Sequence, residues 1–156
     1  MTFLVDCMLG KLAKWLKILG FDTLYFSRAE DDDLLALARG EGRVLLSRDH
    51  ALLGRAKGIT ALFIETESWP GQVRQVLARF DLAGAVRPYS RCLECNVPLK
   101  TLTRAEAANL VVPFVLERAE TFALCPSCGR VYWPGTHYEA MREQIEALLY
   151  PCQSSE

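Results

Sequence analysis

The sequence predicts an α/β protein in which a parallel sheet, flanked by helices, is followed by a small zinc ribbon. Two observations support this fold class. Short apolar runs alternate with amphipathic helical stretches over residues 1–85, which is the pattern of successive β-α-β units. The alternating pattern ends at residues 86–91, and two Cys-x-x-Cys pairs follow in turn-like segments. We therefore expect an α/β domain over residues 1–85 and a zinc ribbon with a closing helix over residues 86–156.

The composition is that of a folded globular chain in which basic and acidic side chains nearly balance. The 156 residues are 51% hydrophobic, and 18 basic against 19 acidic side chains give a formal net charge of −1. A strongly basic surface, which often carries non-specific nucleic-acid binding, is missing, so any RNA contact must come from local patches. No segment approaches the ~18 apolar residues of a membrane span. No signal-peptide pattern is visible either, so we expect a cytoplasmic protein.

The first half is expected to alternate four strands with four helices. The strands are predicted at residues 3–5, 22–26, 43–47 and 59–64, and the helices at residues 9–19, 31–39, 50–57 and 69–82. The first helix has its leucines at helical spacing on one face, and Gly20 is suited to end it. Asp31 is expected to cap the second helix, with Asp32 and Asp33 favourable near its positive end.

The second half shows fewer and shorter elements. A Thr-x-x-Glu capping box, formed by Thr103 and Glu106, predicts a short helix over residues 103–109. Two apolar segments, residues 122–124 and 130–133, flank the second cysteine pair in the manner of a hairpin. A closing helix is expected over residues 138–150.

The cysteines indicate a structural zinc site. The proposed ligands are the two Cys-x-x-Cys pairs, Cys92 with Cys95 and Cys125 with Cys128. Four thiolates satisfy tetrahedral Zn²⁺ and leave no open position, so the ion is expected to be structural. A redox dithiol in one pair is the alternative, although neither pair lies between a strand and a helix of a β-α-β unit. Cys7 is expected to be a small buried residue and Cys152 a free thiol.

Acidic residues occur where two of the predicted strands end. Asp6 follows the first strand and Asp49 follows the third, while Asp31 and Asp32 begin the second helix. Ligands of open parallel sheets bind beyond the carboxyl ends of the strands. Converging carboxylates suit Mg²⁺ or Mn²⁺, which can activate water for phosphodiester hydrolysis. Alternatively, Asp31 and Asp49 serve as helix caps alone, a role that Asp6 does not share.

Several of these segments carry a family resemblance. They are the runs Phe3-Leu-Val-Asp6, Asp31-Asp-Asp-Leu-Leu35 and Gly42-Arg-Val-Leu-Leu-Ser-Arg-Asp49, together with the helical stretch over residues 8–22. In combination they resemble the PIN-like ribonuclease superfamily, and specifically the Mutator-seven C-terminal RNase domain type, which also occurs as a stand-alone protein ending in a zinc ribbon. The resemblance extends to about residue 140.

The resemblance implies a Rossmann-like, PIN-like sheet and RNA cleavage that depends on a divalent metal. Asp6 and Asp49 match the first and third acidic positions of the family. Asp31 matches the second position best and Asp32 next, so these four residues are the expected catalytic group, with Asp6, Asp31 and Asp49 as ligands of Mg²⁺ or Mn²⁺. His50 follows Asp49 where some members have a further acid, which leaves the number of ions open.

The leading hypothesis is therefore a metal-dependent ribonuclease that hydrolyses RNA phosphodiester bonds. Lys11 and Arg48 lie nearest the expected site and are predicted to hold substrate phosphates. One alternative is a non-catalytic RNA- or protein-binding module that keeps the PIN-like fold and the zinc ribbon. A thiol oxidoreductase is the other, and it would need a reactive cysteine pair without zinc. The RNA substrate, the endo- or exonucleolytic mode and the oligomeric state stay open.

Overall fold

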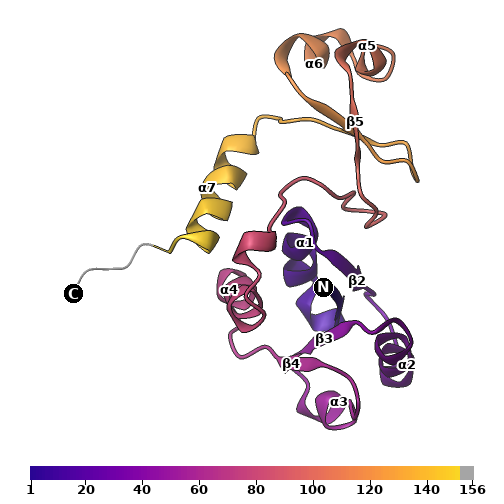
Figure 1. The fold of residues 1–156 in the computed structure, drawn as a ribbon, viewed down its shortest axis with the longest axis vertical. Helices are drawn as coiled ribbons and strands as arrows, with labels where there is room; N and C mark the ends of the chain where they lie inside the picture. The colour runs from indigo at the N-terminus through magenta and orange to yellow at the C-terminus, as the bar shows by residue number, and fades with distance from the viewer. Residues whose placement is uncertain (152–156) are drawn as a thin grey trace, which may run out of the picture. The chain divides into compact units, whose positions relative to one another are not determined.

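The computed structural model describes residues 1–151 (Figure 1). The chain divides into two compact units, the first over residues 1–89 and the second from residue 90 onward. Cys152, expected to be a free thiol, lies outside the described residues. Within residues 1–151, no helix has the length and apolar character needed to cross a membrane.

The first unit is a four-stranded parallel sheet with helices on both faces. Its strands are β1 (Thr2–Val5), β2 (Asp22–Tyr25), β3 (Val44–Ser47) and β4 (Ala61–Phe63). Its helices are α1 (Gly10–Ile18), α2 (Asp31–Glu41), α3 (His50–Gly54) and α4 (Trp69–Arg79), with short 3-10 helices η1 (Cys7–Leu9) and η2 (Ala83–Ala85). The strand order is β2-β1-β3-β4, and every pairing is parallel. This confirms the predicted α/β class.

Side chains that alternate along the central strands fill two separate layers of the core. Leu4 of β1 pairs with Leu45 of β3, and both pack in the apolar cluster that α2 and α3 cover. Phe3 points to the opposite face, where its ring contacts the rings of Phe21 and Phe80 at 6.0 and 6.1 Å. Figure 1 shows α1 and α4 on that side of the sheet and α2 and α3 on the other. Strands buried on both faces explain the nearly continuous apolar runs of the sequence.

The strand order creates a topological switch point between β1 and β3. From β1 the chain crosses to β2 on one side, returns past β1 to β3, and continues to β4 on the other side. The backbone N–H of Asp6 donates to the carbonyl oxygen of Leu46 at 3.0 Å, which extends the pairing one residue past β1. Open α/β sheets bind ligands in the crevice at such a point, beyond the carboxyl ends of the strands.

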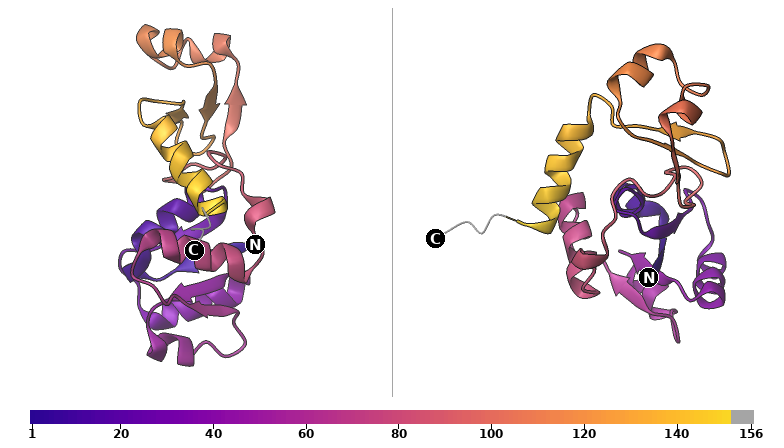
Figure 2. Two further views of the ribbon diagram at one scale, coloured as in Figure 1. Left: turned by 90° about the vertical axis from the view of Figure 1, so that its left-hand side faces the viewer. Right: turned by 45° about the horizontal axis from the view of Figure 1, so that its top comes forward.

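The second unit is a small antiparallel sheet with short helices. Its strands β5 (Lys100–Leu102), β6 (Phe122–Leu124) and β7 (Val131–Tyr132) are ordered β5-β6-β7, and its helices are α5 (Arg104–Ala107), α6 (Pro113–Arg118) and α7 (Tyr138–Leu149). Helices α5 and α6 lie side by side in every view (Figures 1 and 2). A minor core of Leu102, Ala107, Ala119 and Phe122 holds them to the sheet. The predicted hairpin, capping box and closing helix are confirmed, whereas β5 and α6 were not predicted.

Two local expectations were wrong. Asp31 is the first residue of α2 rather than its cap, because the chain turns into the helix one residue earlier, at Glu30. The helix also continues through Gly40 and ends at Gly42, whose φ of +65° is the left-handed conformation that glycine adopts without strain. Cys7 is exposed rather than buried, because the 3-10 turn after Asp6 directs its side chain outward.

Candidate active site and metal centre

A hydrogen-bonded chain links the two acidic residues at the switch point. The hydroxyl of Ser47, the last residue of β3, donates to Oδ2 of Asp6 at 2.8 Å. The same hydroxyl oxygen accepts the backbone N–H of Asp49 at 2.9 Å. Oδ1 of Asp49 accepts the N–H groups of Ala51 and Leu52 at 2.8 and 3.2 Å, so Asp49 caps α3. The capping role anticipated as an alternative for Asp49 is therefore present at the same edge as Asp6.

Asp6 is held rigidly at the end of β1. Its Oδ1 accepts the N–H of Cys7 at 2.6 Å, so Asp6 caps η1, and the expectation that it has no capping role was wrong. The residue is 7% exposed. A nearly buried carboxylate is costly unless its oxygens are satisfied, and Asp6 has a donor on each oxygen. Tyr25 closes the same edge, because its hydroxyl donates to the carbonyl oxygen of Cys7 at 2.9 Å. The oxygen lone pairs that remain on Asp6 are available to a cation.

The third acidic position lies on α2 and has a basic partner. Arg55, just after α3, forms ion pairs with Asp31 at 3.9 Å and with Asp32. Asp31 is the less exposed of the two carboxylates, with 48% of its side chain accessible against 82% for Asp32. The single guanidinium therefore draws both carboxylates toward α3.

Asp31 nevertheless acts electrostatically on the edge that contains Asp6. The pKa of the Cys7 thiol is raised, first by its hydrogen bond with Asp6, then by burial and by the charges of Asp6 and Asp31. A thiol whose pKa is raised by two carboxylates stays protonated at neutral pH. Cys7 is therefore a neutral neighbour of the acidic edge rather than a nucleophile.

The three carboxylates share an edge without converging on one point. Within residues 1–151, the four cysteines are the one set of three or more His, Cys, Asp or Glu side chains whose ligand atoms all lie within 4.8 Å of one another. Asp6, Asp31 and Asp49 do not form such a set. Like charges repel at short range, and Arg55 offers Asp31 a partner on the far side.

The two cationic side chains predicted to bind phosphate make different contacts within the protein. Lys11 is exposed on α1, with Nζ 5.6 Å from the ring centroid of Trp69. Arg48 is held by the segment after β4, where Nη1 donates to the carbonyl oxygen of Ile64 at 3.3 Å and Nη2 lies 3.9 Å from Glu67. Lys11 is thus held by an aromatic ring and Arg48 by oxygen atoms of the segment after β4.

The four predicted zinc ligands come together in the second unit. The Sγ atoms of Cys92, Cys95, Cys125 and Cys128 lie within 4.8 Å of one another, and those of Cys92 and Cys128 are 3.9 Å apart. Four cysteine ligands in two Cys-x-x-Cys turns suit Zn²⁺ in tetrahedral geometry. The arrangement is that of a structural metal site such as a zinc ribbon, and it does not favour the redox dithiol.

The two cysteine turns have the same backbone design. In each turn the N–H of the second cysteine donates to Sγ of the first at 3.4 Å. The residue after each pair, Asn96 or Gly129, is left-handed, with φ of +61° and +78°. The N–H of that residue returns to the carbonyl oxygen of the first cysteine at 2.9 Å. Asparagine and glycine suit this position, because they adopt the left-handed conformation more easily than other residues.

Tyr132 supports the first cysteine turn. Its hydroxyl oxygen accepts the N–H of Leu93 at 3.1 Å, which leaves the hydroxyl hydrogen for Sγ of Cys92, also at 3.1 Å. Burial alone would raise the pKa of Cys92, but hydrogen bonds from Tyr132 and from the backbone lower it to about 6. Burial and the hydrogen bond with Cys92 raise the pKa of Tyr132 to about 12. The lowered pKa of Cys92 favours its thiolate form, which is the form that binds zinc.

Ser47 is the functional residue that the sequence analysis missed. It is fully buried, yet in the sequence it looks like a small residue ending an apolar run. The position of Ser47 at the end of a buried strand, next to the strand that ends in Asp6, is the signal that could have identified it. A hydroxyl at the end of a buried strand needs a partner, and the adjacent strand ends in Asp6.

The fold and site define a class of protein, namely a Rossmann-like α/β domain with acidic residues at the ends of its central strands, joined to a four-cysteine metal centre. The family model described as the Mut7-C RNAse domain matches residues 1–145, and the chain belongs to this family. The predicted family relationship is thereby confirmed. It points to a ribonuclease, a hydrolase whose substrate is RNA. No curated protein and no solved structure matches the chain.

Proposed function

We propose that this chain is a divalent-metal-dependent ribonuclease whose active site is the acidic edge of the first unit. The observation that carries the proposal is the hydrogen-bonded link from Asp6 through Ser47 to Asp49 at the switch point of the sheet. In a ribonuclease family, two preorganised carboxylates at that place are suited to metal-assisted hydrolysis. Asp31 is the third ligand in this proposal, with Asp32 as its substitute.

The donor set fits a hard divalent cation. Asp6, Asp31 and Asp49 offer carboxylate oxygens alone, which are the ligands that Mg²⁺ and Mn²⁺ prefer. To join the other two, the carboxylate of Asp31 would turn from Arg55 toward Asp6. This movement would break the 3.9 Å ion pair between Asp31 and Arg55.

Each residue of the edge has a separate task in hydrolysis. When bound, the ion would lower the pKa of an attacking water and stabilise the leaving oxygen. Ser47 keeps the Asp6 carboxylate fixed, while the α3 amino terminus fixes Asp49. Arg48 and Lys11 hold the phosphates of the RNA beside these carboxylates. The zinc ribbon provides a rigid second unit and takes no part in the bond cleavage.

One observation favours the alternative of a non-catalytic RNA- or protein-binding module. Asp31 and Asp32 are paired with Arg55 instead of converging on Asp6. If that pairing persists when Mn²⁺ is supplied, the edge carries two carboxylates rather than three. Such a site would bind a cation weakly, and RNA binding would not depend on it.

The experiment that separates these functions is a cleavage assay on a mixed panel of fluorescent single- and double-stranded RNAs. The zinc-loaded wild-type chain is incubated with Mn²⁺, with Mg²⁺, or without added divalent ion, and its zinc content is measured afterwards. We expect cleavage that requires Mn²⁺ or Mg²⁺ while zinc stays bound. RNA binding without cleavage under any of these conditions would establish the binding module instead.

A further inference from the structure

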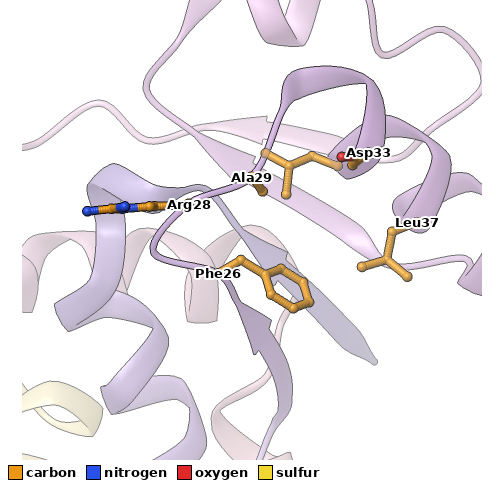
Figure 3. Close-up of a pocket in the computed structure, with 6 residues that line it drawn as sticks. Phe26, Arg28, Ala29, Asp33 and Leu37 are labelled. Atoms are coloured by element: carbon orange, nitrogen blue, oxygen red, sulfur yellow. The ribbon is translucent and has the colours of Figure 1, made fainter.

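A shallow pocket lies beside the amino terminus of α2 (Figure 3). Its volume is about 250 Å³, and its lining residues come from the loop after β2 and from α2, namely Phe26, Arg28, Ala29, Asp33, Leu34 and Leu37. Pockets that enclose small-molecule ligands usually measure ~300–1,000 Å³. The smaller and open space suits a single flat group, such as one nucleobase, whose sugar and phosphate remain outside.

The pocket begins just after β2, the strand that lies beside β1 and its terminal Asp6. Val5 pairs with Tyr25 in the sheet, so Phe26 leaves β2 at the level where Asp6 leaves β1. Residues two apart in a helix project about 200° from each other. Asp31 therefore faces Arg55 on one side of the α2 amino terminus, and Asp33 lines the pocket on the other. A nucleic-acid strand that crosses this helix terminus would meet the carboxylates and the pocket in succession.

The lining combines an apolar surface with unused polar groups. Phe26 is 41% exposed, so part of its ring surface is open to a ligand. Figure 3 shows its ring and the Leu37 side chain bordering the same space, with Asp33 on the helix beside them and the Arg28 guanidinium extending away. In the part of the chain that the structure describes, the side chains of Asp33 and Arg28 have no hydrogen-bond or ion-pair partner.

We propose that this pocket binds a guanine base of single-stranded RNA beside the cleavage site, an inference that rests on the proposed ribonuclease function. RNA-binding sites stack unpaired bases on aromatic rings and hydrogen-bond their Watson–Crick edges. A carboxylate can only accept hydrogen bonds and has two oxygens for the purpose. Guanine alone presents two adjacent donors on that edge, N1–H and the 2-amino group. Adenine, cytosine and uracil each place an acceptor beside their donor, which would face the Asp33 carboxylate unfavourably.

Arg28 has a different task in this arrangement. Its guanidinium extends away from the Phe26 ring, on the loop between β2 and α2. In that position it meets the phosphate of the nucleotide whose base occupies the pocket. Phosphate contacts add affinity without reading the sequence. Base preference is therefore assigned to Asp33, stacking to Phe26, and general affinity to Arg28.

The test is a binding measurement that does not depend on catalysis. The zinc-loaded full chain carrying Asp6→Asn, which we expect to leave RNA intact, is titrated with short labelled oligouridylates that contain a single guanine, inosine, adenine or cytosine. We expect the guanine oligonucleotide to bind about tenfold more tightly than the adenine or cytosine one, a factor within the range for bidentate base contacts. Inosine, which lacks the 2-amino group, should fall between them.

Three further variants in the same background assign the effect to residues. Asp33→Asn should abolish the guanine preference, because the amide places a donor against a guanine donor. Glu30→Gln is the matched control, since it removes one exposed negative charge from the same helix terminus outside the pocket, and it should keep the preference. Phe26→Ala should weaken binding to every oligonucleotide by about tenfold, because stacking on the ring is lost.

The outcomes separate this pocket from the proposed function. Equal affinity for the four oligonucleotides, or a guanine preference that survives Asp33→Asn, would overturn the pocket assignment. Mapping of wild-type cleavage products provides a second readout, and we expect cuts at a constant offset from guanine that become scattered in Asp33→Asn. A guanine preference that depends on Asp33 in a chain that never cleaves RNA would refute the nuclease and leave the pocket standing.

Discussion

At the residue scale, Ser47 decides how the central carboxylates are arranged. Its hydroxyl donates to Asp6 and accepts from the N–H of Asp49, so one buried side chain orients both ends of the acidic edge. Neither contact involves RNA or metal. Ser47 is therefore a positioning residue, and its loss should affect stability as well as activity.

We predict that Ser47→Ala destabilises the chain by about 1–3 kcal/mol, because it leaves Asp6 and the Asp49 N–H without their partner. Urea unfolding of the zinc-loaded chain measures this change. Ser27→Ala, at an exposed loop position, is the control and should stay within about 0.5 kcal/mol of wild type. An unchanged unfolding midpoint for Ser47→Ala would show that water replaces the hydroxyl and that the link is unimportant.

Residue-level expectations succeeded where chemistry restricts the choices and failed where geometry decides. The four zinc cysteines could be found because two Cys-x-x-Cys pairs supply the four thiolates of a closed tetrahedral site. The exposure of Cys7 could not be predicted, because the 3-10 turn after Asp6 sets the direction of the Cys7 side chain. The ion pair between Arg55 and Asp31 could not be predicted either, because α2 and the residue after α3 come together only when the chain folds.

At the element scale, the capping box of α5 shows how a very short helix is maintained. Thr103 Oγ accepts the N–H of Glu106 at 3.2 Å, and the Glu106 carboxylate accepts the Thr103 N–H at 3.3 Å. The Thr103 N–H and the Thr103 hydroxyl, which donates to Oε1 of Glu106 at 3.0 Å, lower the pKa of Glu106 and keep it charged at neutral pH. A helix of four residues has little stability of its own, so its cap should matter.

We predict that Thr103→Ala weakens the start of α5 by about 1 kcal/mol, the usual cost of losing a threonine cap. Hydrogen exchange of the Glu106 amide should then become about fivefold faster, because this N–H loses its acceptor. The amides of β6, which pair with neighbouring strands, serve as an internal reference. Unchanged exchange at Glu106 would mean that the helix start is held by the apolar core alone.

Elements with strong patterns were predictable, and short elements made by tertiary pairing were not. The parallel strands appear in the sequence as apolar runs because both faces of the sheet are covered. β5 is a three-residue segment, Lys-Thr-Leu, that becomes a strand only by pairing with β6. α6 begins at Pro113 and exposes Phe114, so it lacks the apolar stripe by which helices are recognised.

At the scale of the whole molecule, the two units are maintained by different forces. The first has an apolar core on each face of its sheet, while the second combines a minor core with the four-cysteine centre. Small metal-bound domains are often unfolded without their ion. We therefore expect the two units to respond differently to zinc removal.

We predict that removal of zinc by a strong chelator unfolds the second unit and leaves the first folded. Hydrogen exchange followed by mass spectrometry should show lost protection from residue 90 onward and preserved protection in β1 and β3. Restoring zinc should restore both patterns. Loss of protection in both units at once would show that they fold as one, and retained protection in both would show that the metal is dispensable.

Zinc binding should also weaken as the pH falls. The pKa of Cys92 is lowered to about 6, so its thiolate is present above that pH and takes up a proton below it. Because zinc binds thiolates, its affinity should decline most steeply below about pH 6. Release of zinc to a coloured indicator during acid titration measures this dependence. A zinc affinity that does not fall as the pH is lowered to about 5 would contradict zinc binding by thiolates at this site.

The central claim is that the acidic edge of the first unit hydrolyses RNA with a divalent ion. The most direct test compares Mn²⁺-dependent RNA cleavage by wild type and Asp6→Asn, with zinc content and circular dichroism measured in both. Asp81→Asn, the same change at an exposed position away from the sheet edge, is the control. We predict a loss of at least ~100-fold in Asp6→Asn and full activity in Asp81→Asn. Cleavage at the wild-type rate by a folded, zinc-loaded Asp6→Asn chain would contradict the account.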